Sequence, residues 1–91
     1  MQESSIQSSI RKYLKKEGWF VTKLILTSTA GIPDLLAIKD GRHVFIEVKS
    51  DRYNKAEEGL SPLQIARIAE LRSYGAEIII AKSVHEITKT L

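Results

Sequence analysis

Apolar residues recur every three or four positions in two stretches of the chain, a spacing typical of amphipathic helices. Ile6, Ile10 and Leu14 mark the first stretch, a predicted helix over residues 3–17, which Gly18 can end. The second helix is expected to begin with Ser61 as its N-cap and Pro62 in its first turn, and to end at Gly75. A third helix is predicted from Ser83 to the C-terminus, opened by the capping box formed by Ser83 and Glu86.

Shorter apolar runs, rich in β-branched and aromatic residues, predict four strands. They cover residues 19–26, 34–39, 43–49 and 77–81. Asp40-Gly41 lies between the second and third strands and is a strong hairpin signal. Residues 27–33 and 50–59 are polar and are expected to form loops, the second of them mobile. The order α-β-β-β-α-β-α predicts one α/β domain over residues 1–91, with a mixed central sheet flanked by helices.

The predicted hairpin places two carboxylates close together. If Lys39 pairs with Arg42 across the turn, the same register makes Asp34 the partner of Glu47. Cross-strand partners have Cβ atoms about 4.5–5.5 Å apart, and two like charges at that distance are destabilising. A divalent cation between them would relieve the repulsion, and Mg²⁺ typically takes one or two carboxylates, water and substrate phosphate.

Lys49 lies one pleat beyond Glu47 and therefore points to the same face of its strand. A cation there can orient an attacking water or stabilise charge that develops on a phosphate. Asp34, Glu47 and Lys49 together indicate metal-assisted phosphodiester hydrolysis. Structural alternatives remain: Asp34 could bond to its own loop, and Glu47 and Lys49 could be solvent-facing charges of a one-sided sheet.

Two helical residues point in the same direction as the strand residues. Glu3 shares the inward stripe of the first helix, and Gln64 shares a stripe with Ile68 and Leu71 on the second. Both are candidates for the site. Glu3 also suits the positive end of a helix dipole, and Gln64 also fits a capping box with Ser61, a role compatible with one in the site.

Composition narrows the class of protein. The 91 residues carry a net charge of +3 and include no cysteine, which excludes disulfides and thiolate zinc sites. No apolar run reaches the roughly 18 residues of a membrane helix, and there is no secretory signal. We expect an intracellular, cytoplasmic protein without a membrane partner. The basic balance alone is weak evidence for a nucleic-acid partner.

Four motifs in order resemble those of a known superfamily: Gly31-Ile32-Pro33-Asp34, Glu47-Val48-Lys49, the N-terminal Glu3, and Ser61-Pro62-Leu63-Gln64. They resemble the PD-(D/E)XK nucleases, and within these the virus-type replication-repair nuclease (VRR-NUC) domain. The chain is also similar to archaeal Holliday junction resolvases. The resemblance spans nearly the whole chain and implies a restriction-endonuclease-like core.

The resemblance also implies a set of roles for individual residues. Asp34, Glu47 and the Val48 carbonyl would bind Mg²⁺ or Mn²⁺, with Lys49 as the catalytic lysine and Glu3 and Gln64 in accessory positions. Glu3 is also a candidate metal ligand. The residues expected to contact DNA are Arg11, Lys15, Ser28, Arg52 and Lys55.

The function implied by this resemblance is DNA cleavage at branched structures, most directly resolution of four-way junctions by a homodimer. A dimer would supply two sites and bury further apolar surface. Its candidate interface residues, which core packing explains equally well, are Ile65, Ile68, Leu71 and Ile79. The alternatives are a flap or single-strand nuclease, and a non-catalytic DNA-binding module on the same fold. A small-ligand binding domain lacks support because the chain has no glycine-rich phosphate loop.

Overall fold

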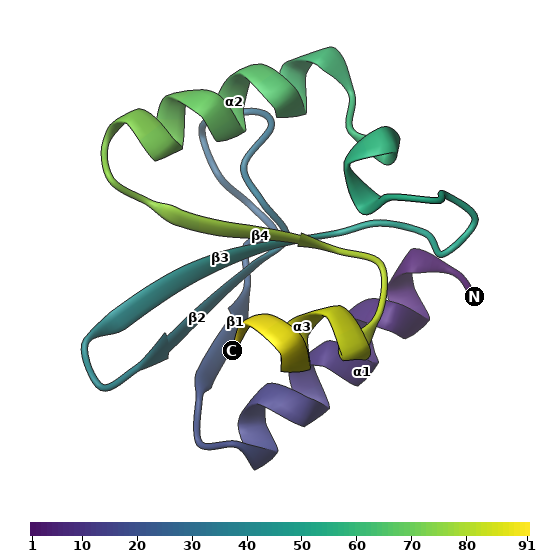
Figure 1. Ribbon diagram of the computed structural model, residues 1–91. Coiled ribbons are helices and arrows are strands. Elements are labelled where there is room, and N and C mark those ends of the chain that lie inside the picture. The colour runs from purple at the N-terminus through teal and green to yellow at the C-terminus, as the bar shows by residue number, and fades with distance from the viewer.

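A computed structural model describes all residues from Met1 to Leu91 (Figure 1). Its helices and strands follow the predicted order, with one additional short 3₁₀ helix, η1, before the second α-helix. In chain order the elements are α1 (Glu3–Lys16), β1 (Phe20–Lys23), β2 (Leu35–Lys39), β3 (Arg42–Val48), η1 (Ala56–Gly59), α2 (Pro62–Ser73), β4 (Glu77–Ala81) and α3 (Val84–Thr90).

The four strands form one mixed sheet in the order β1-β2-β3-β4. β1, β2 and β3 are antiparallel neighbours, while β4 runs parallel to β3 after the crossover through α2. The predicted hairpin register is confirmed, since Lys39 pairs with Arg42 and Leu35 pairs with Ile46. Asp40 and Gly41 both have positive φ, as the two-residue turn requires.

Helices cover both faces of the sheet, so the molecule has three layers (Figure 1). α1 and α3 lie on one face, and α2 lies on the other. Under α1 and α3 one face of β3, formed by Val44, Ile46 and Val48, is completely buried against Ile10 and Leu14. The opposite face of β3 is also buried, but it carries Glu47 and Lys49.

The first strand is shorter than predicted. It ends at Lys23, after which the Leu24 N–H donates to the Asp34 carbonyl over 2.8 Å. The next two residues, Ile25 and Leu26, are then 74% and 95% exposed in the loop. Phe20 is largely exposed on the edge strand β1, while its neighbour Trp19 is buried.

Residues 50–59 are more ordered than an irregular polar loop. Ala56 is buried at the start of η1, and Lys82 Nζ donates to the Tyr53 carbonyl over 2.9 Å. The N-terminal amine of Met1 pairs with Asp51 at 3.0 Å. These contacts come from both ends of the chain, which explains why local composition alone predicted a mobile loop.

The predicted helix caps are confirmed with one difference. Ser61 and Gln64 form a complete capping box at the start of α2. At α3 the Ser83 hydroxyl accepts from the Glu86 N–H as predicted, but the Glu86 carboxylate accepts from Lys82 N instead of closing the box. None of the helices has the length and apolar character needed to span a membrane.

Candidate active site

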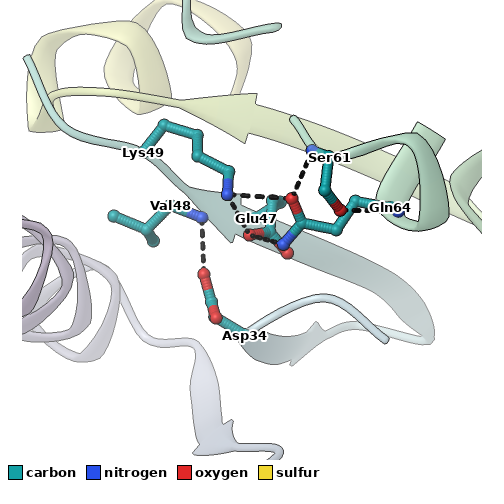
Figure 2. Close-up of polar contacts among 6 residues, drawn as sticks. All are labelled: Asp34, Glu47, Val48, Lys49, Ser61 and Gln64. Atoms are coloured by element: carbon teal, nitrogen blue, oxygen red, sulfur yellow. Dashed lines mark hydrogen bonds and ion pairs between the residues drawn. The ribbon is translucent and has the colours of Figure 1, made fainter. Parts of the chain in front are cut away.

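Asp34 lies at the point where β2 and β3 separate. Its carboxylate accepts a hydrogen bond from the Val48 N–H over 2.8 Å, so the side chain takes over where the backbone ladder ends (Figure 2). The alternative in which Asp34 bonds to its own loop is therefore not what the structure has. This bond fixes Asp34 against the end of β3 that carries Glu47 and Lys49.

Glu47 is a buried acid, with only 2% of its surface exposed. Its pKa is raised from 4.5 to about 7, first by burial and then by the negative charge of Asp34, while the Lys49 ammonium opposes the rise. The influence of Asp34 on this pKa is what the predicted pairing of two carboxylates would produce. The alternative of solvent-facing charges on a one-sided sheet is wrong, because α2 covers this face and Lys49 is only 7% exposed.

Gln64 connects Lys49 to Glu47 (Figure 2). Its Oε1 accepts from Lys49 Nζ over 3.0 Å, and its Nε2 donates to Glu47 Oε2 over 3.2 Å. Lys49 Nζ itself lies 3.4 Å from Glu47 Oε2. The three side chains thus form a closed triangle of polar contacts beneath the first turn of α2.

The helix cap decides which way the Gln64 amide faces. The Ser61 N–H needs an acceptor and takes Gln64 Oε1 at 2.9 Å, while the Ser61 hydroxyl accepts from the Gln64 N–H at 3.1 Å. With Oε1 directed at two donors, the amide nitrogen must face Glu47. One conformation of Gln64 therefore caps the helix and contacts the site residues, so the two predicted roles are compatible.

The donor set suits a hard divalent cation. Asp34 and Glu47 supply carboxylate oxygens. Burial, and after it the charge of Asp34, raises the pKa of Glu47, and a bound cation would offset both of these costs of ionising it. Two carboxylates with water and phosphate oxygens are a normal set for Mg²⁺. The backbone carbonyl of Val48, on the residue between Glu47 and Lys49, is the third donor expected from the resemblance.

Glu3 lies outside this carboxylate pair. No three side chains among the Asp, Glu, His and Cys residues are grouped closely enough to hold a metal ion. Glu3 is exposed on the first turn of α1. The pKa of the Arg52 guanidinium is raised chiefly by its hydrogen bond to Tyr53 and, least of all, by the charge of Glu3. Its expected role as a ligand remains a prediction.

The residues predicted to contact DNA do not share one location. Arg52 and Lys55 are exposed in the segment that follows Lys49, and Ser28 is exposed in the loop that leads to Asp34. Lys15 lies in the last turn of α1, and just after this helix the Glu17 carbonyl accepts from Lys39 Nζ of the β2–β3 hairpin. Arg11, in the middle of α1, is half-buried, and its Nε has no hydrogen-bond partner.

Two residues near the Lys49 side chain, Tyr53 and Gly59, were not predicted to belong to the site. The Lys49 Cδ and the Tyr53 ring both approach Gly59 closely. A signal existed in the sequence, since Gly59 stands just before a helix cap without any turn motif to require it.

Known proteins share the fold of this chain. Two solved structures resemble the chain over most of its length. One, described as "VRR_NUC domain", has a TM-score of 0.81 and 28% identity and covers 96% of this chain and 90% of its own. Another, "VRR_NUC domain protein", has a TM-score of 0.76 and 21% identity over 98% and 84% and supports the fold alone. No curated protein matches the chain significantly.

A family model described as archaeal Holliday junction resolvase (hjc) matches residues 3–89. Together with the VRR-NUC neighbours it confirms the predicted resemblance and the restriction-endonuclease-like fold, and it supports a nuclease function. The chain belongs to the archaeal Holliday junction resolvase (hjc) family.

Proposed function

We propose that the protein is a Mg²⁺-dependent, structure-selective DNA endonuclease that hydrolyses phosphodiester bonds in four-way junctions. The observation that supports this most strongly is the buried contact of Lys49 with Glu47 and Gln64, beside Asp34. Burying an ion pair beside a second carboxylate costs folding stability. A purely structural role therefore explains this arrangement poorly. Perturbed acids grouped in this way are typical of catalytic sites.

In this proposal Asp34, Glu47 and the Val48 carbonyl hold Mg²⁺, with Mn²⁺ as a substitute. The bound ion would polarise the scissile phosphate and lower the pKa of a water molecule. Lys49 directs its ammonium toward the attacking water or toward the charge that develops on the phosphate. Gln64 keeps that ammonium beside the carboxylates, because its Oε1 accepts from Lys49 and its Nε2 donates to Glu47.

DNA would approach from the end of the sheet where Asp34 and Glu47 lie. The exposed Arg52, Lys55 and Ser28 flank that end and would contact the phosphate backbone without reading sequence. Lys15 and Arg11 lie away from that end, on α1. They would contact the phosphates of a junction arm that extends past α1.

The decisive experiment is cleavage of end-labelled four-way junction, flap, duplex and single-stranded DNA, each with Mg²⁺ or with EDTA. Paired symmetric nicks in the junction alone, abolished by EDTA, are the expected result. The matched variant Asp34→Asn keeps the size of the side chain and removes its charge, so it should bind junctions and fail to cut them. Binding without any cleavage by the wild type would instead favour the non-catalytic module, and cleavage of flaps or single strands would favour the alternative nuclease.

Junction resolution requires two sites, and we assign the dimer contact to the outer side of α2 and β4. A hollow of about 320 Å³ lies there, lined mainly by apolar residues that include Leu60, Ile65 and Ile80. Ile65 is 55% exposed, whereas Ile68 is buried against the sheet and Leu71 and Ile79 are half-buried. Of the four candidates, Ile65 is thus the one most available to a partner.

Sedimentation of the wild type and of Ile65→Glu tests this contact. The wild type should sediment as a dimer, and the charged variant should be a monomer that retains its fold by circular dichroism. A wild type that is monomeric at assay concentration would contradict the dimer.

A further inference from the structure

Gly59 is the one glycine of the chain that its backbone conformation does not explain. The other four, Gly18, Gly31, Gly41 and Gly75, have positive φ, which side chains rarely tolerate. Gly59 has no such φ and ends the short helix η1. We therefore explain its lack of a side chain by the space that neighbouring side chains need, and not by its backbone conformation.

The space beside Gly59 is filled by Tyr53 and by Lys49. A Cβ at position 59 would lie 2.7 Å from Tyr53 Cε2, closer than real contacts allow, and 3.0 Å from Cδ2, which is a tight contact. It would also lie 3.1 Å from Lys49 Cδ. The aromatic ring and the alkyl stem of the lysine thus meet at the same bare backbone position.

Tyr53 is contacted at its backbone and at its ring. Lys82, just past the end of β4, donates to the Tyr53 carbonyl over 2.9 Å. The Arg52 guanidinium donates to the Tyr53 hydroxyl over 2.7 Å and stacks on the ring with its central carbon 4.9 Å from the ring centre. The Lys82 bond thus holds the backbone of Tyr53, and the exposed Arg52 guanidinium contacts the ring, so a larger residue 59 would crowd the ring and the Lys49 stem together.

We infer that Tyr53 and Gly59 are positioning residues for Lys49. Gly59 admits the Tyr53 ring, and the two form the wall that keeps the lysine stem directed toward Glu47 and Gln64. This inference rests on the proposed function for its kinetic consequence, but the packing itself concerns the metal-free protein. Displacing a catalytic group by about 1 Å can cost up to about a hundredfold in rate.

The test measures single-turnover cleavage of a four-way junction and, separately, junction affinity without Mg²⁺. Gly59→Ala should lower the cleavage rate roughly ten- to a hundredfold while the Kd changes less than about twofold. Tyr53→Ala should also slow cleavage, and Tyr53→Phe, which keeps the ring, should restore a rate near that of the wild type. Asn54→Ala, at an exposed position in the same segment, is the matched control and should match the wild type.

The double variant Tyr53→Ala/Gly59→Ala tests whether a clash with the Tyr53 ring causes the loss of activity in Gly59→Ala. If the clash with Tyr53 is the cause, the methyl group fills space vacated by the ring, and the double variant loses less than the product of the single losses. Losses that multiply, or a Gly59→Ala enzyme as fast as the wild type, would overturn the inference. If Gly59→Ala does not fold, the comparison of Tyr53→Phe with Tyr53→Ala decides, and equal rates for these two would overturn it.

A second readout does not need cleavage. In metal-free protein the NMR chemical shifts of the Lys49 side-chain methylenes should change in Tyr53→Ala and stay unchanged in Asn54→Ala. An inert wild type with the expected methylene shifts would refute the proposed nuclease and leave the packing intact. An active wild type whose methylene shifts ignore Tyr53 would refute the positioning role alone.

Discussion

The two faces of β3 are both buried, yet one carries apolar side chains and the other carries charged ones. Val44, Ile46 and Val48 pack apolar atoms against α1 and α3 and leave no polar group to satisfy. On the other face Glu47 and Lys49 are nearly as inaccessible, but α2 meets them with the amide of Gln64. The first face gains stability by burying apolar surface, and the second loses some by burying charge. One strand thus separates the part of the fold that stabilises it from the part that we propose acts on DNA.

The sharpest way to break this comparison is to remove the buried ammonium. Lys49→Ala should lower junction cleavage on the order of a thousandfold, equivalent to about 4 kcal/mol in the barrier, because a preorganised charge is lost from the site. The measurement is single-turnover cleavage with Mg²⁺. Lys39→Ala, at the other end of the same hairpin, is the control and should cut normally. Equal activity of Lys49→Ala and the wild type would contradict the proposed mechanism.

The apolar face should show the opposite behaviour. Ile46→Ala leaves a cavity at a completely buried position and should lower the free energy of unfolding by roughly 2–5 kcal/mol. Urea denaturation measures the loss. Any protein that remains folded at low temperature should cleave junctions at a normal rate per folded molecule. A specific loss of cleavage with unchanged stability would show that the two faces are not separable.

The polar face should make the metal-free protein sensitive to pH. Glu47 has a pKa of about 7 when folded and 4.5 when free, so it favours the folded state below pH 4.5 and loses that contribution as pH rises through 7. The loss has an upper limit of about 3 kcal/mol, at about 1.4 kcal/mol per pH unit. Denaturation in EDTA from pH 5 to pH 8 measures it.

Asp34→Asn provides the control for this pH dependence. It removes the neighbouring charge that, after burial, helps to raise the pKa of Glu47, so the loss of stability should be smaller and should end at a lower pH. Added Mg²⁺ should stabilise the wild type at pH 8 more than this variant. A pH profile that is identical in both proteins would show that the two carboxylates do not interact.

The smallest effect is expected at an exposed ion pair. Arg67 and Glu70 lie one turn apart on α2 and are in contact, but the Glu70 side chain is half-exposed. Glu70→Gln should change the free energy of unfolding by about 0.3 kcal/mol, and less at high salt. Thermal denaturation at two salt concentrations checks this. A large effect would mean that surface charge pairs matter here as much as the buried contact between Lys49 and Glu47.

Much of the fold could be predicted because its signals are local. Asp40-Gly41 fixed the hairpin register, and that register placed Asp34 at the level of Glu47. The Ser61 cap and Gln64 could likewise be read from neighbouring residues. The burial of Lys49 could not, because it depends on where α2 lies after the crossover. The order in residues 50–59 was missed for the same reason, since Lys82 and Met1 supply it from distant parts of the chain.

The capping box of α2 has a consequence for how the site opens and closes. Gln64 Oε1 accepts from the Ser61 N–H and from Lys49 Nζ at once, so fraying of the first helical turn also releases the lysine. Hydrogen-exchange protection of the Gln64 backbone N–H, which donates to the Ser61 hydroxyl, should therefore report how often the site is assembled. The stability of this single helical turn would then set the fraction of molecules in which Lys49 is in place to react.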